Sequence, residues 1–144
     1  MKKIGIACDH AGFELKEHLV DYLKKKGYEV EDFGTDSPES TDYPDTAHLL
    51  ANAVAEGKYL SGMTLCGSGN GISMTANRHK GVRAALCWRP EIAILARQHN
   101  DANICSIPAR FVSVAEAEII TDLFLSVEFE GGRHRRRIEK IENF

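Results

Sequence analysis

The chain has 144 residues, a formal net charge of −3 and 43% hydrophobic residues, which fits one ordinary domain over residues 1–144. The slight acidity argues against a nucleic-acid-binding protein, because such proteins need a clear basic excess. No apolar run approaches the ~18 residues that a membrane span requires, so we expect neither nucleic acid nor a membrane as a partner.

Short apolar runs alternate with longer helical patterns along the chain. In the first half, the predicted elements are a strand at Lys3–Cys8, a helix at Phe13–Lys26, a strand at Glu29–Phe33 and a helix at Pro44–Glu56. The second half continues with a strand at Met63–Cys66, a helix at Ile72–Asn77, a strand at Val82–Cys87, a helix at Pro90–His99, a strand at Ile104–Ile107 and a helix from the Ser113 capping box to Leu125. This alternation predicts an α/β fold, a three-layer α/β/α sandwich around a five-stranded parallel, Rossmann-like sheet.

The C-terminal tail, residues 130–144, begins with a glycine joint and continues as a short basic helix. At ~100° per residue, Arg133 and Arg137 share one face, while Ile138 and Ile141 lie on a different face that can dock. The convergent arginine pair suits a phosphate through forked hydrogen bonds, although a basic run is more often simply solvated. The hinged helix can pack on its own domain or reach a partner.

The glycine-rich turn Gly67-Ser68-Gly69-Asn70-Gly71 is the strongest local signal. Three glycines in five residues let the backbone approach a ligand and aim its N–H groups inward, to hold a phosphate or to stabilise an oxyanion. The turn matches neither a P-loop, nor the dinucleotide fingerprint, nor the hydrolase elbow, so no nucleotide cofactor is predicted. A tight strand–helix turn without any ligand is the alternative interpretation.

The four cysteines differ in their sequence context. Cys66 directly precedes the glycine turn, where amide dipoles favour the thiolate, a usable base or nucleophile. Cys8, Cys87 and Cys105 fall within predicted strands and suit the role of small buried residues, which remains the alternative for Cys66 as well. No C-x-x-C pair is present, so we expect no metal site and free thiols in a reducing, cytoplasmic environment.

Reactive side chains gather at the strand junctions. In open parallel sheets, ligands bind beyond the carboxyl ends of the strands, and we count Asp9 and His10 after the first strand and Cys66 after the third. We add His99 and Asn100, which lie between the fourth helix and the fifth strand. Each histidine can shuttle protons near neutral pH, or can merely satisfy a turn or a helix end.

Five motifs occur in a specific order along the chain: Cys8-Asp9-His10, Thr41-Asp42-Tyr43-Pro44, Cys66-Gly67-Ser68-Gly69-Asn70-Gly71-Ile72-Ser73, Arg97-Gln98-His99-Asn100-Asp101-Ala102-Asn103 and Glu130-Gly131-Gly132-Arg133-His134. With them, the whole chain resembles the type B ribose-5-phosphate isomerases of the ribose/galactose isomerase family. The resemblance implies interconversion of ribose 5-phosphate and ribulose 5-phosphate through a cis-enediolate, without cofactor or metal. It also implies a homodimer, or a dimer of dimers, with shared active sites, and places the second strand at one sheet edge beside the first.

The resemblance assigns roles to individual residues. Cys66 is expected to be the base that moves a proton between C1 and C2, and His99 to assist opening of the furanose ring, with Asp9 and Ser68 beside them. Serine replaces the threonine of many relatives at position 68 and keeps the hydroxyl without the methyl. The residues expected to bind the substrate are Asp9, His10, Tyr43, Gly67, Ser68, Gly69, Asn70, Gly71, Asn100, Arg110, Arg133 and Arg137.

Other functions remain compatible with the sequence. A six-carbon substrate, such as allose 6-phosphate or galactose 6-phosphate, needs the same chemistry and only a longer pocket. A non-catalytic phosphate-binding module needs the glycine turn and the tail arginines but neither Cys66 nor His99. A thiol redox sensor is disfavoured because Cys66 has no resolving cysteine nearby.

Overall fold

A computed structural model describes residues 2–144. Its elements are, in chain order, β1 (Lys3–Cys8), a 3₁₀ turn (His10–Gly12), α1 (Phe13–Lys25), β2 (Glu29–Asp32), α2 (Tyr43–Ala55), β3 (Ser61–Cys66), α3 (Asn70–Ala76), β4 (Ala84–Leu86), α4 (Pro90–Gln98), β5 (Ile104–Pro108), α5 (Val114–Ser126) and α6 (Arg133–Glu142). Within these residues, five parallel strands form one sheet in the order β2-β1-β3-β5-β4. The predicted parallel sheet is confirmed, and β2 lies at the edge beside β1 as expected.

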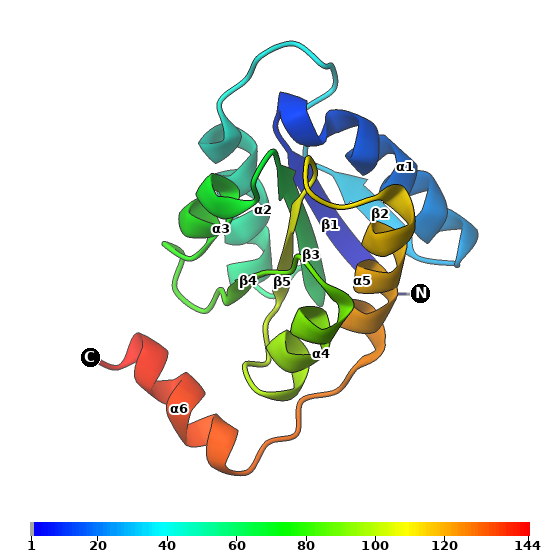
Figure 1. Cartoon of the computed structure of the whole chain (residues 1–144). Helices are drawn as coiled ribbons and strands as arrows, with labels where there is room; N and C mark the ends of the chain where they lie inside the picture. Colours follow the sequence, from blue (N-terminus) through cyan, green and yellow to red (C-terminus); the bar gives the residue numbers. More distant parts are fainter. Residues whose placement is uncertain (1) are drawn as a thin grey trace.

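Helices cover both faces of the sheet (Figure 1). One core cluster joins the sheet to α1, α4 and α5, with Leu19 and Phe124 almost fully buried in it. The other joins the sheet to α2 and α3 through Leu50 and Ala76. Because side chains alternate along a strand, Ile6 of β1 belongs to the first cluster and Ala7 to the second. The predicted three-layer sandwich is therefore confirmed.

The edge strand β4 is shorter than the expected Val82–Cys87. Side-chain amides replace ladder hydrogen bonds at its beginning: Asn77 Oδ1 accepts from the Ala84 amide at 2.8 Å and its Nδ2 donates to the Ala84 carbonyl at 2.9 Å. In the same way, Asn103 Oδ1 accepts from the Arg83 amide at 2.8 Å. These contacts satisfy the backbone groups that a longer strand would have paired.

The tail helix α6 extends away from the sandwich at the end of the molecule where α4 finishes (Figure 1). Its connection to the body includes the Glu130 amide, which donates to the Gln98 carbonyl at 3.1 Å, and the Gly81 amide, which donates to Glu142 Oε1 at 2.8 Å. Ile141, which we expected to dock, is exposed, and the buried side chain of α6 is His134. Among residues 2–144, no helix combines the length and apolar character needed to cross a membrane.

Candidate active site

A cleft of about 500 Å³ opens at the carboxyl edge of the sheet, where β1 and β3 end side by side. The glycine-rich turn after β3 forms one part of its wall, and the turn after β1 forms another. The lining residues are Asp9, His10, Ala11, Tyr43, Cys66, Gly67, Ser68, Gly71, Arg110 and Phe111. Eight of the residues expected from the sequence therefore meet in one cleft.

Cys66 differs from the other three cysteines in its surroundings. It is 5% exposed and lines the cleft, with Ala47 and Ile72 packed behind it. Cys8 is fully buried, and this burial raises the pKa of its thiol to about 12. Burial also raises the pKa of Cys105. A solute in the cleft can thus meet Cys66, while Cys8 and Cys105 have the inert, buried character predicted for them.

The glycine turn needs glycine for steric reasons. Gly69 has φ +77°, in the left-handed region, and immediately precedes α3. A Cβ on Gly71 would lie 2.5 Å from Cζ of Tyr43, so the tyrosine ring lies directly against the turn. The Ser68 hydroxyl oxygen accepts a hydrogen bond from the Asn70 amide at 3.2 Å. The turn residues Gly67, Ser68 and Gly71 and the ring of Tyr43 therefore line the cleft together with Cys66.

The residues after β1 are fixed by local hydrogen bonds. Asp9 Oδ1 accepts from the amides of Ala11 at 2.9 Å and of Gly12 at 3.2 Å, which caps the 3₁₀ turn. His10 Nδ1 accepts from the Thr41 amide at 3.1 Å, so a neutral ring carries its proton on Nε2. His10 can therefore offer a donor to an anion in the cleft while the loop after β2 holds its other nitrogen.

Four expected site residues lie at the opposite end of the sheet. His99 follows α4 and Asn100 precedes β5, so both lie at the amino edge, and Arg133 and Arg137 stand on α6 at that same end (Figure 1). Our placement of His99 and Asn100 with the carboxyl-edge junctions was wrong, because a helix that leads into a parallel strand must end at the amino edge of that strand. One chain thus carries two separate groups of candidate residues.

Comparison with known proteins places this arrangement in a family. The model of the ribose/galactose isomerase family matches residues 4–141. The chain belongs to the ribose/galactose isomerase family. It is 48% identical to ribose-5-phosphate isomerase B of Escherichia coli over 98% of this chain and 95% of that protein. The family resemblance inferred from the sequence motifs is thereby confirmed.

Solved structures of the family have the same fold. A ribose 5-phosphate isomerase from Thermotoga maritima superposes with a TM-score of 0.97 at 52% identity, covering 99% of both chains. Ribose-5-phosphate isomerase B from Mycoplasma genitalium, solved with bound ribulose 5-phosphate, has a TM-score of 0.93 at 45% identity, covering 96% of this chain and 93% of that one. The α/β fold of this chain is therefore the fold of solved members of its family.

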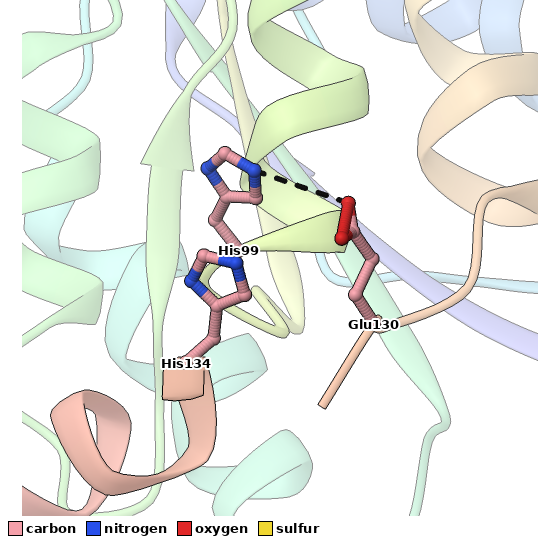
Figure 2. Close-up of side chains that lie close together, drawn as sticks. All are labelled: His99, Glu130 and His134. Atoms are coloured by element: carbon pink, nitrogen blue, oxygen red, sulfur yellow. Dashed lines mark ion pairs between the residues drawn. The ribbon is translucent and has the colours of Figure 1, made fainter. Parts of the chain in front are cut away.

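In this family member, the amino-edge group contains two residues to which the sequence interpretation gave no role, Glu130 and His134. The rings of His99 and His134 stack at 13° with centroids 4.3 Å apart, and His99 Nε2 lies 3.9 Å from Glu130 Oε1 (Figure 2). The pKa of His134 is lowered, mainly by loss of contact with water and to a smaller extent by the nearby His99 and Arg133. The sequence contained a signal that His134 faces the body of the protein. In a helix, it lies one turn before Ile138, on the face that was expected to dock.

Proposed function

We propose that this chain is an aldose–ketose isomerase that interconverts ribose 5-phosphate and ribulose 5-phosphate. The observation that carries the proposal is the position of Cys66, in the cleft wall directly before the glycine-rich turn, whose Gly67, Ser68 and Gly71 line the same cleft. The names of the Escherichia coli and Mycoplasma genitalium relatives support the choice of a five-carbon substrate. Residues 1–144 would act as one isomerase domain in the cytoplasm, where the four free thiols stay reduced.

In the proposed reaction, the Cys66 thiolate removes the proton on C2 of the open-chain aldose. The C–H electrons form the C1–C2 double bond, and the carbonyl electrons move to O1, which gives a cis-enediolate. The thiol then returns the proton to C1, while O1 gains a proton and the O2 hydroxyl loses one to give the ketose. Amides of the turn from Gly67 to Gly71 would stabilise the negative charge on oxygen, and Tyr43 would bound the sugar.

Opening of the furanose ring and binding of the phosphate would require both groups of residues. His10 and Arg110 lie at the cleft, whereas His99, Arg133 and Arg137 lie at the amino edge of the same chain. We propose that a homodimer, alone or as part of a dimer of dimers, joins the carboxyl-edge group of one copy to the amino-edge group of the other. Asn100 would enter the site with His99, next to Asp9 and Ser68.

Replacing Cys66 tests the proposal directly. Cys66→Ala should lower turnover of ribose 5-phosphate by about 10²–10⁴-fold, the usual contribution of a positioned proton-transfer group, while ribose 5-phosphate still binds. Turnover is followed by the appearance of ribulose 5-phosphate, and binding by calorimetry. Cys105→Ala is the matched control, because that thiol is buried away from the cleft and its loss should leave turnover unchanged.

Two outcomes would reject parts of the proposal. A wild-type protein that binds ribose 5-phosphate but never converts it would be a phosphate-binding module without catalytic activity. Faster turnover of allose 6-phosphate or galactose 6-phosphate than of ribose 5-phosphate would keep the isomerase chemistry and replace the five-carbon substrate with a six-carbon one.

A further inference from the structure

A cluster of two histidines and a glutamate lies outside the cleft, at the amino edge of the sheet. His99 at the end of α4, Glu130 in the linker and His134 on α6 bring one ligand atom each within 4.8 Å of the others (Figure 2). Among residues 2–144, it is the one group of three or more histidine, cysteine or acidic side chains that could share an ion. We propose that these three side chains bind a zinc ion.

The donor set fits zinc. Two imidazoles and one carboxylate, with a fourth position open to water, are the ligands of a known class of zinc site. Magnesium and calcium prefer all-oxygen sites, so two nitrogen donors select against them. In the single chain, His134 is a buried ligand, whereas Glu130 and His99 keep side-chain exposures of 51% and 39%.

The geometry requires only side-chain movement. Bonds of about 2.0–2.2 Å in a tetrahedron place ligand atoms roughly 3.3–3.6 Å apart. His99 Nε2 and Glu130 Oε1 are now 3.9 Å apart. The Glu130 backbone is fixed because its N–H donates a hydrogen bond to the Gln98 carbonyl at 3.1 Å, while its exposed carboxylate can rotate. The His99 ring must tilt out of its 13° stack with His134, so that both nitrogen lone pairs point to one ion.

The neighbouring charges oppose a cation in part. Arg133 and Arg137 on α6 are close enough to act electrostatically on His134, but both side chains are exposed, so solvent and salt screen them. Glu130 supplies the compensating negative charge. We therefore expect zinc affinity to increase with ionic strength, as this repulsion is screened.

Zinc at this cluster should inhibit the enzyme, a consequence that rests on the proposed function. His99 would assist ring opening there, and a zinc-bound imidazole has no free lone pair for proton transfer. Inhibition should be reversed by a chelator. Because binding and inhibition are measured separately, failure of the isomerase proposal leaves the zinc proposal open to its own test.

Titration calorimetry of the full chain with zinc chloride tests the site. Wild type should bind one zinc ion per chain, and Glu130→Gln and His134→Phe should each weaken binding by more than about tenfold, equivalent to 1.4 kcal/mol. Cys66→Ala removes the cleft thiol, another zinc ligand, and should leave the affinity unchanged. His48→Ala disrupts the exposed His48–His79 pair, whose nitrogens are 2.8 Å apart, and should also leave it unchanged.

The outcomes separate the competing sites. Loss of zinc binding in Cys66→Ala or His48→Ala would overturn the proposal, as would unchanged affinity in Glu130→Gln. Glu130→Gln alters a half-exposed side chain, so it remains decisive even if His134→Phe does not fold. In activity assays, Glu130→Gln should need more than about tenfold more zinc for half-inhibition, the same factor as in binding; inhibition at the wild-type zinc concentration would contradict the site.

Discussion

The thiols of Cys8 and Cys66 lie on neighbouring strands but differ in their accessibility. Cys8 and Cys66 end neighbouring strands, yet only Cys66 of these two lines the cleft, and burial raises the pKa of Cys8 to about 12. We expect iodoacetamide to alkylate Cys66 more than about tenfold faster than Cys8 at neutral pH, because the thiolate is the reactive form. Peptide mass spectrometry after timed quenching measures both rates. Equal labelling in the folded protein would contradict the assigned environments.

The exposed pair His48–His79 predicts a pH effect on stability. The pKa of His79 is lowered from its ordinary 6.5, mainly by partial desolvation and to a smaller extent by the charge of His48. Below about pH 6.5 the unfolded chain therefore binds more protons than the native one, and stability falls as the pH decreases further. Between about pH 7 and pH 5, the urea concentration at the unfolding midpoint should therefore fall less in His79→Gln than in wild type. An identical loss in wild type and variant would exclude this contribution.

The packing of α2 against α3 places Tyr43 over Gly71 in the cleft wall. In wild type, Gly71→Ala should cost about 1–3 kcal/mol of unfolding free energy, because its Cβ meets the ring of Tyr43. In a Tyr43→Ala background the same substitution should stabilise by up to about 1 kcal/mol, since alanine is the better helix former. Urea unfolding of the wild type, the two single variants and the double variant gives this double-mutant cycle. The same sign in both backgrounds would show that Tyr43 is not the obstacle.

At the level of elements, periodicity predicted nearly all of the fold. The strands around Cys66 and the capping box at Ser113 form where expected, because local propensity and the hydrophobic pattern agree there. The shortened β4 could not be predicted, since the Asn77 side chain that bonds to Ala84 comes from another element. The stack of His134 on His99 likewise depends on where the linker after α5 places the start of α6, which no local pattern specifies.

The cleft was predictable because its residues follow directly from the strands. Cys66 is the last residue of β3 and His10 lies two residues after the end of β1, and parallel strands deliver their carboxyl ends to one edge. The position of His99 also followed from chain order, since α4 leads into β5, but residue type was given more weight than topology. That error matters at the scale of the whole molecule, because it concealed the division of the candidate site into two groups.

At the scale of the whole molecule, the proposed homodimer predicts complementation between inactive variants. Cys66→Ala disables the carboxyl-edge group and His99→Ala the amino-edge group, so each homodimer should be inactive. In a mixed dimer, one site combines the intact Cys66 of one copy with the intact His99 of the other. Random exchange makes about half of the dimers mixed, each with one working site of two, so activity should recover to about a quarter of wild type.

The recovery is measured after the two purified variants are unfolded together in urea and refolded. Each variant refolded alone is the matched control and should stay inactive. Two copies of Cys66→Ala with different tags provide a second control, since subunit exchange without complementary groups should restore nothing. If the mixture of Cys66→Ala and His99→Ala stays inactive although the tags show mixed dimers, the two groups do not share a site across the interface, and the proposed route for ring opening is wrong.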